Sequence, residues 1–199
     1  LNRIYNAVVR RIKSIPNKLK WSYSSESLKN KKKINRYYNL HKGKRCFLVA
    51  NGPSLKKMNL SFLQNEISFG LNRIYLAYDE MAFTNDYLVS INSLVLNQFN
   101  EEIQELKMPK FLNWESRDIF KDDESIFYIY KKIFGNKFGK DASKSLNPAA
   151  TVTYAALQII YYMGFSEVII IGMDHNFVTK SKNQPNKTEL RDEEVDLNH

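Results

Sequence analysis

The sequence predicts an α/β domain of the Rossmann-like, doubly wound type, with a mainly parallel sheet, helices on both faces and a basic N-terminal helical arm in front. Two observations carry this prediction. Short apolar runs of strand length recur between helical or loop segments, and each run ends in small or polar residues. Such runs are typical of parallel strands, which are buried on both faces and joined by helical crossovers.

The first strand is expected at residues 45–50 (RCFLVA), where a continuous apolar run ends at the turn residues Asn51, Gly52 and Pro53. Cys46 in this run is the only cysteine of the chain. Without a second thiol it predicts neither a disulfide nor a thiolate metal site, so we expect it to be packed in the core.

The middle of the chain continues the same pattern. A short helix is expected at 59–65, and strands are expected at 67–71, 87–91 and 110–113. Residues 118–144 mix aromatic and charged residues without a sustained period. They predict a loop or insertion over the site.

The clearest helix pattern begins at Asn147 and Pro148 and ends near Met163, with Gly164 as its stop. This pattern is apolar nearly all round, which predicts a buried helix. The β-branched run at 167–171 (EVIII) follows directly and predicts a central strand.

Charge divides the chain into two parts. Residues 1–45 contain 14 of the 30 Lys and Arg but a single acidic residue, Glu26, which gives +13, whereas residues 46–199 carry −4. We therefore expect a basic, partly helical arm over 1–44 and a nucleotide- or nucleotide-sugar-binding domain over 45–199, which we expect to continue beyond this sequence. Because the body is mildly acidic, nucleic acid is not an expected partner.

The arm is expected to be solvated, and its pattern of a basic amphipathic helix makes contact with an anionic membrane the second reading. Its apolar residues recur at spacings near three and four: Ile4, Val8, Val9, Ile12 and Ile15. No apolar run reaches the roughly 18 residues of a membrane-spanning helix, and no secretory signal is evident. The expected location is the cytoplasm, with peripheral attachment at the inner face of the membrane.

Polar residues follow the predicted strands, at the edge where doubly wound sheets bind ligands. Asn51, Asn72 and Asn92 follow three of the runs, and Asp174 follows the last. Asparagine offers a donor and an acceptor without charge, which suits ribose, phosphate or base edges, although it also caps loops. Asp174 suits ribose or sugar hydroxyls, a metal ion or a cap. Their repetition at successive strand ends predicts a binding site.

The turn at 51–54 predicts a phosphate-binding loop. Gly52 permits close backbone approach, Pro53 stiffens the turn, and Ser54 can donate to an anion or cap the next helix. The spacings of a P-loop and of the GxGxxG dinucleotide fingerprint are both absent. The loop therefore predicts a nucleotide-sugar or nucleotide diphosphate ligand.

Further candidates lie on other elements. Thr151 and Thr153 fall in the first turns of the predicted buried helix, where hydroxyl and amide groups favour an anion or simply cap. His175 and His199 are the acid–base candidates near these elements. The carboxylates of 189–196 suit Mg²⁺, but charged loops are more often solvated, so no metal is assigned.

Two related families resemble this sequence in four segments: VANGPSL at 49–55, LN at 71–72, IN at 91–92 and GFSEVIIIGMDHNF at 164–177. One is the MptE-like family, named for an archaeal 6-hydroxymethylpterin pyrophosphokinase and also found in proteins of flagellin and surface-glycan gene clusters. The other is the bacterial sialyltransferase family that uses CMP-sialic acid. Both have an Asn-Gly-Pro-Ser-Leu loop after the first strand and a Gly-hydrophobic-Asp strand end.

The sialyltransferase resemblance implies roles for the strand-end residues. It implies that Asn51, Gly52 and Ser54 face the phosphate and ribose of the donor. It also implies that Asn72 and Asn92 contact the nucleotide-sugar, while the Asp at the last strand end borders the nucleotide.

The same resemblance implies a catalytic histidine after the last strand, for which His199 is the nearest match. The residues Thr151, Val152 and Thr153 stand where that family has a Thr-Ser-Gly turn. This departure weakens the case for sialic acid as the donor sugar.

Together these features predict a bacterial glycosyltransferase. It would move a nonulosonic or sialic-acid-like sugar from a nucleotide donor, CMP-linked by preference, to a surface glycan or protein acceptor, with His199 as the base and no cofactor. The alternative enzyme is an MptE-like pyrophosphokinase that transfers diphosphate from ATP, with Mg²⁺, to a hydroxymethylpterin-like alcohol. The alternative without catalysis is a module that binds a nucleotide-sugar or glycan.

Overall fold

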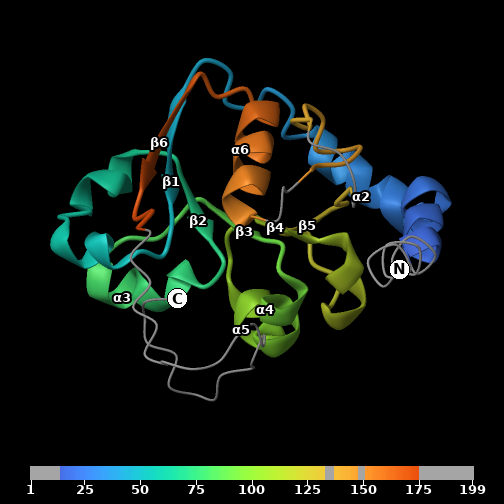
Figure 1. Cartoon of the computed structure of the whole chain (residues 1–199), viewed down its shortest axis with the longest axis horizontal. Helices are drawn as coiled ribbons and strands as arrows, with labels where there is room; N and C mark the ends of the chain where they lie inside the picture. The colour runs from blue at the N-terminus through green and yellow to red at the C-terminus, as the bar shows by residue number, and fades with distance from the viewer. Residues whose placement is uncertain (1–13, 133–136, 148–150, 175–199) are drawn as a thin grey trace, which may run out of the picture.

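The computed structural model describes residues 14–132, 137–147 and 151–174 (Figure 1). These residues form a six-stranded sheet in the order β5-β4-β3-β2-β1-β6, and every pairing between neighbouring strands is parallel. The strands are β1 (Arg45–Val49), β2 (Ser68–Leu71), β3 (Tyr87–Ser90), β4 (Lys110–Asn113), β5 (Ile126–Ile129) and β6 (Glu167–Ile171). The predicted Rossmann-like α/β class is confirmed.

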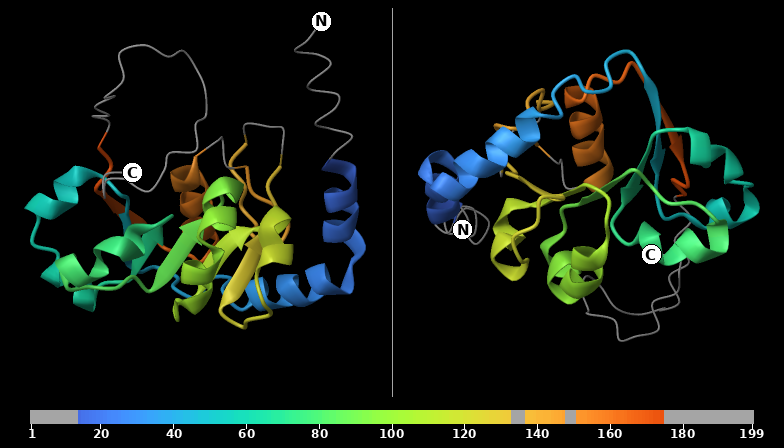
Figure 2. Two further views of the ribbon diagram at one scale, coloured as in Figure 1. Left: turned by 90° about the horizontal axis from the view of Figure 1, so that it is seen from below. Right: turned by 180° about the vertical axis from the view of Figure 1, so that it is seen from behind.

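Helices lie on both faces of the sheet, as Figures 1 and 2 show. Residues 14–23 are helical and lead into the next helix. The α-helices that follow are α2 (Ser25–Asn35), α3 (Tyr78–Met81), α4 (Ser93–Gln98), α5 (Asn100–Glu105) and α6 (Val152–Tyr162). Short 3-10 helices complete the crossovers: η1 (Pro53–Lys57), η2 (Ser61–Asn65), η3 (Ile74–Ala77) and η4 (Trp114–Ile119).

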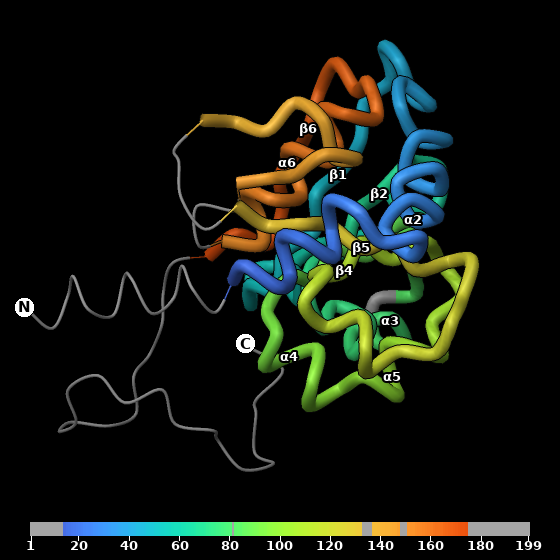
Figure 3. Tube along the Cα trace, turned by 90° about the vertical axis from the view of Figure 1, so that its right-hand side faces the viewer, coloured from blue at the N-terminus to red at the C-terminus, as the bar shows by residue number. Residues whose placement is uncertain are grey.

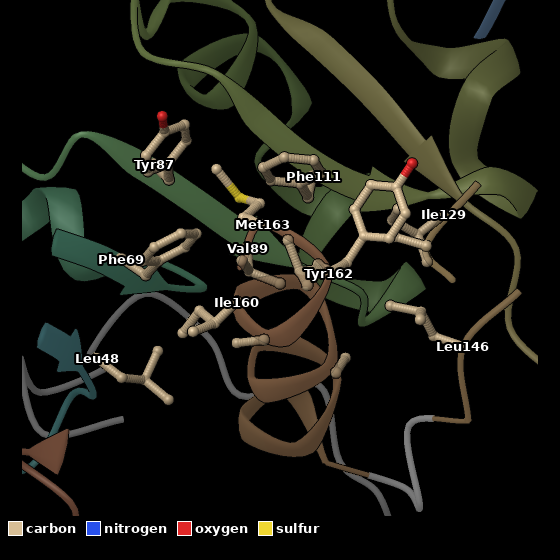
Figure 4. Close-up of a cluster of buried hydrophobic side chains, with 14 of the residues drawn as sticks. Leu48, Phe69, Tyr87, Val89, Phe111, Ile129, Leu146, Ile160, Tyr162 and Met163 are labelled. Carbon is tan, nitrogen blue, oxygen red and sulfur yellow. The ribbon is translucent and has the colours of Figure 1, made fainter. Parts of the chain in front are cut away.

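The two faces of the sheet have separate hydrophobic cores, because successive side chains of a strand point to opposite sides. Leu48 packs with α2 and α6 on one face, whereas its neighbour Val49 packs with η1, η2, α4 and α5 on the other. Figure 4 shows part of the first core, in which Phe69 and Val89 approach Ile160 of α6. The sequence of β1 after Arg45 is therefore apolar.

Cys46 of β1 is completely buried in this first core, as predicted. Burial raises the pKa of its thiol to about 12, because the thiolate would lose its hydration. The cysteine thus acts as a packing residue.

The order of the strands places a switch point beside β1. From β1 the chain builds outward through β2, β3, β4 and β5, and it then returns through α6 to add β6 on the other side of β1. The pairing of β1 with β6 runs from Arg45 opposite Glu167 to Val49 opposite Ile171. Ligands of doubly wound sheets bind at the carboxyl ends of the strands where the order reverses, which here lies between β1 and β6.

Two expectations about strands were wrong. The segment 118–144 is not solely a loop, because it contains β5, which pairs with β4 along its whole length. The run EVIII was predicted as a central strand, but β6 pairs only with β1 among the described residues, and Ile170 is 41% exposed. β-branched residues suit any strand that pairs on one side and buries one face. The composition of β6 therefore does not require a neighbouring strand on each side.

The buried helix also begins later than predicted. α6 starts at Val152 rather than at Asn147, because the side chain of Thr151 accepts a hydrogen bond from the Tyr154 amide and so caps the helix. Pro148 lies outside the described residues. The expected end is confirmed, since Gly164 has a φ of +87°, the left-handed conformation that commonly follows a helix.

The described part of the basic segment packs on the domain. α2 crosses the β5 side of the sheet, as Figure 3 shows. The carboxamide of Asn30 donates to the Tyr128 carbonyl and accepts from the Tyr128 amide, both at 2.8 Å, so it pairs with the backbone of β5 as a strand would. This contact covers part of an otherwise open sheet edge.

The apolar residues expected to contact a membrane are placed only in part. Ile4, Val8, Val9 and Ile12 lie outside the described residues, and Ile15 is 50% exposed. Within the described ranges, no helix combines the length and the apolar composition needed to cross a bilayer.

His41 predicts a loss of stability in mild acid. Its Nε2 lies 2.7 Å from the Tyr87 hydroxyl, and burial and Lys44 lower its pKa below 6.5 against the opposing effect of Asp86. A lowered pKa in the folded state means that the unfolded chain binds the proton first as the pH falls. We expect the free energy of unfolding to decrease from about pH 7 to about pH 5, measured by urea denaturation. In His41→Phe this decrease should be smaller, and equal pH slopes for the two proteins would contradict the role of His41.

Candidate functional site

The loops after β1 and β6 meet at the switch point and are joined by two hydrogen bonds. The amide of Gly52 donates to the carbonyl of Gly172 at 2.7 Å. The amide of Ser54 donates to Oδ2 of Asp174, also at 2.7 Å. The two strand ends therefore lie together, and their shared role in binding a ligand stays a prediction.

Both glycines are required by lack of space at this junction. A Cβ on Gly52 would lie 2.3 Å from Oδ2 of Asp174 and 2.4 Å from the Gly172 carbonyl oxygen. A Cβ on Gly172 would lie 2.6 Å from Cγ of Leu55, and Gly172 also has a φ of +67°. The two loops therefore approach as closely as glycine backbones allow.

The carboxylate of Asp174 changes the expected chemistry of the loop. It accepts the amide of Ser54 in η1, which is the group that a phosphate-binding loop would offer to its ligand. A carboxylate in this place repels a phosphate but accepts hydrogen bonds from hydroxyl groups. The Oδ1 atom of Asn51 is buried and accepts no hydrogen bond from the described residues. The junction is therefore better suited to ribose or sugar hydroxyls.

The asparagines after β2 and β3 lie on the same sheet edge, and both have local roles. Asn72 has a φ of +50°, and its Oδ1 accepts a hydrogen bond of 3.4 Å from Ser90. Asn92 caps α4, since its Oδ1 accepts from the Leu94 amide at 3.0 Å. Their position on the expected edge is as predicted, and their contact with a ligand stays a prediction.

A fourth asparagine was missed. Asn113 ends β4, is completely buried, and joins two crossovers: its Nδ2 donates to Ser93 at 2.7 Å and its Oδ1 accepts from the Glu115 amide. It follows the same sequence rule as Asn92. Applying that rule to the fourth run would have found it.

The two threonines lie at the start of α6, which packs against β2 and β3. Thr151 is exposed and caps the helix, while Thr153 is half-buried in its first turn. The amino end of the helix lies on the side of the sheet that carries the other candidates, as expected for a crossover that is antiparallel to the strands. Their role toward an anion stays a prediction.

Lys131 is a further polar residue at this edge that the sequence did not reveal. Its Nζ donates to the carbonyl of Ile91, which directly follows β3, at 3.1 Å. Burial lowers the pKa of Lys131, and Glu115 partly opposes this shift. No sequence pattern identifies Lys131, because it lies in the aperiodic segment after β5.

The predicted bases are not among the residues that the structure describes. His175 and His199 are outside the described residues, and so are the carboxylates of 189–196. His41 contacts Tyr87 at the start of β3, which is the opposite edge of the sheet. Over the ranges that the structure describes, no group of three or more His, Cys, Asp or Glu side chains could hold a metal ion.

Comparisons with known proteins agree with the fold and identify the family. The computed structure is similar to that of the MAf glycosyltransferase from Magnetospirillum magneticum AMB-1, with a TM-score of 0.50 and 16% sequence identity. The match covers 79% of this chain but only 29% of that protein. A search of curated proteins gives no significant match. The family model described as 6-hydroxymethylpterin diphosphokinase MptE-like matches residues 23–180, and the chain therefore belongs to the MptE-like family.

Proposed function

We propose that this protein is a glycosyltransferase that binds a nucleotide-activated sugar at the carboxyl edge of its sheet. The observation that carries the proposal is the junction between β1 and β6, where Asp174 is held by the Ser54 amide beside two glycines that admit close approach. A carboxylate at the switch point of a doubly wound sheet is the group that accepts ribose hydroxyls in many nucleotide sites. The neighbouring Oδ1 of Asn51 is a buried acceptor without a hydrogen-bond donor among the described residues.

The transfer reaction requires further groups in the site. The bond between the sugar and the phosphate of the donor breaks, and the oxygen of an acceptor hydroxyl forms the new bond. Groups that stabilise the departing phosphate and a base that takes the hydroxyl proton both accelerate this step. Thr151 and Thr153 are our candidates for the first role, and His199 is our candidate for the second. A CMP-linked, sialic-acid-like donor and a glycan or protein acceptor remain our preferred substrates.

The description of the family favours a second candidate, a diphosphokinase. Such an enzyme would transfer diphosphate from ATP to the hydroxyl of a hydroxymethylpterin-like alcohol, and it would need Mg²⁺ held by carboxylates. Asp174 is one carboxylate at the carboxyl edge of the sheet. The two candidates differ in ligand and in metal dependence, so one set of measurements separates them.

A ligand screen by thermal unfolding tests the proposal. We expect CMP-, UDP-, GDP- or ADP-linked sugars to raise the Tm without added metal, because a ligand at a hundredfold excess over its Kd stabilises by about 2.7 kcal/mol. In a chain of this size that corresponds to a shift of about 5–10 °C. Stabilisation by ATP with Mg²⁺ alone would favour the diphosphokinase, and no response to any of these compounds would contradict both candidates.

The Asp174→Ala variant checks where the ligand binds. We expect it to lose the ligand-induced shift, because the acceptor for ribose hydroxyls is removed at the junction. Glu105→Ala is the matched control, since it removes one exposed carboxylate at the end of α5 and should keep the full shift. An unchanged shift in Asp174→Ala would place the ligand away from the junction.

A further inference from the structure

Lys131 is half-buried, and its partners differ from those of Lys33 and Lys110, which are the fully buried lysines among the described residues. Lys33 donates to the Asp123 carbonyl at 2.8 Å and has Glu124 at 3.8 Å. Lys110 donates to Leu106 and Ser125 and has a carboxylate at 3.6 Å. These two lysines are thus compensated within the fold, as buried charges usually are.

Lys131 forms no ion pair in the part of the chain that the structure describes, although the charge of Glu115 acts on it from beyond ion-pair distance. Its one hydrogen bond goes to the Ile91 carbonyl, and no described carboxylate lies within 4.0 Å of its Nζ. An ammonium group can donate three hydrogen bonds, so two of its donors are available to a ligand. A half-buried cation with spare donors is a suitable partner for an anion.

Lys131 lies at the sheet edge that carries the other candidate site residues. It follows the end of β5 by two residues, and the carbonyl that it contacts follows the end of β3. Lys131 is fixed there because Leu146 forms a parallel bridge with it and hydrogen-bonds to both its neighbours, Tyr130 and Lys132. By contrast, Lys110 is the first residue of β4 and so lies at the opposite edge.

The spacing of the strands relates Lys131 to the junction. β3 is two positions from β1 and three from β6 in the sheet, and neighbouring strands lie about 4.8 Å apart, so the end of β3 is roughly 10–14 Å from the junction. A ligand whose ribose sits at Asp174 and which extends along the sheet edge therefore meets Lys131 with the part beyond its nucleoside. In a nucleotide-activated sugar that part carries the negative charge.

We propose that Lys131 is a specificity-determining residue that binds the anionic oxygens of the ligand beyond its ribose. This inference rests on the proposed function for the location of the ribose, and it adds a cationic contact at a separate strand end. The anion is either the phosphate of the nucleotide or a carboxylate of the transferred sugar, which share the same chemistry toward an ammonium group. The expected ligand class is thus a nucleotide with an extended anionic portion, and not a nucleoside.

Calorimetric titration of the full chain and matched variants tests this inference. We expect Lys131→Met to weaken the binding of CMP-sialic acid at least tenfold, whereas Lys131→Arg should retain most of the affinity. Lys132→Met is the control, because it removes the same charge from the adjacent, exposed residue. Equal weakening of UDP-glucose and CMP-sialic acid would identify the phosphate as the anion, and selective weakening of CMP-sialic acid would identify the carboxylate. Equal affinities in wild type and Lys131→Met would overturn the inference while leaving the proposed function intact.

A second measurement does not depend on the identity of the nucleotide. Acylation of lysine amines, followed by peptide mass spectrometry, reports how accessible Lys131 is with and without inorganic pyrophosphate. We expect pyrophosphate to slow the labelling of Lys131 severalfold and to leave Lys132 unchanged. If no nucleotide or nucleotide-sugar binds, the proposed function fails, and protection by pyrophosphate would still support an anion site at Lys131. Absence of protection together with absence of binding would overturn both.

Discussion

Replacing Gln158 by leucine is expected to lower the free energy of unfolding by about 3–6 kcal/mol, because several buried polar groups would lose their partners at once. The Gln158 side chain is completely buried. Its Oε1 accepts from the amides of Gly139 and Asn147, and its Nε2 donates to the carbonyls of Asn147 and Tyr154. Leucine has a similar volume, so the loss measures hydrogen bonds and not packing.

Urea denaturation of wild type and variant measures this change, with an unchanged m-value as the sign that only stability has shifted. Gln64→Leu is the matched control: Gln64 is exposed and donates one hydrogen bond, to Ala82, so its loss should cost less than about 1 kcal/mol. A loss for Gln158→Leu as small as for this control would mean that the segment around Asn147 is held by other contacts.

This glutamine also bears on how much the sequence could predict. Gln158 lies in the run AATVTYAALQIIYYM, where its only sequence signal is one polar residue in an apolar helix. Two of its partners, Asn147 and Gly139, are 11 and 19 residues away along the chain and become visible only when the segment 139–147 folds back on α6. Buried hydrogen-bond networks of this kind are tertiary features without a local pattern.

The strands show which elements can be predicted from the local sequence pattern alone. β1, β2, β3 and β4 were found because each is an apolar run bounded by turn or polar residues. β5 (IFYI) was missed because it is short and lies among charged residues, and its pairing with β4 is a long-range contact. The exposure of β6 could not be predicted either, because strand order is a property of the sheet and not of the run EVIII.

For the candidate site, too, local sequence patterns were sufficient for some residues, whereas long-range contacts could not be predicted. Residues at the ends of predicted strands, such as Asn51 and Asp174, could be placed on one edge from the sequence, because parallel strands end at one edge. The contact of the Asp174 carboxylate with the Ser54 amide was not foreseen, since it joins residues 120 positions apart. Lys131 was missed for the same reason, because its contact with Ile91 depends on where the chain runs after β5.

The largest effect on ligand binding is expected from Gly52→Ala. The residue has a φ of −76°, which any amino acid can adopt, so glycine is required here by space and not by backbone conformation. The added methyl group would overlap Oδ2 of Asp174 and the carbonyl of Gly172. The two loops must separate to accept it, which would break the hydrogen bond between Ser54 and Asp174. We expect at least a tenfold loss of nucleotide-sugar affinity and about 1–3 kcal/mol lower stability from the overpacking.

Two comparison variants separate this effect from a general loss of stability. Gly43 has a φ of +77° and open space around its Cβ position, so Gly43→Ala should destabilise the chain through backbone strain and leave ligand affinity unchanged. Combining Gly52→Ala with Asp174→Ala removes one of the two overlaps, but the backbone carbonyl of Gly172 still blocks the methyl group. The double variant should therefore recover part of the stability and none of the binding. Full affinity in Gly52→Ala would show that the close approach of the two loops is a packing feature without a role in ligand recognition.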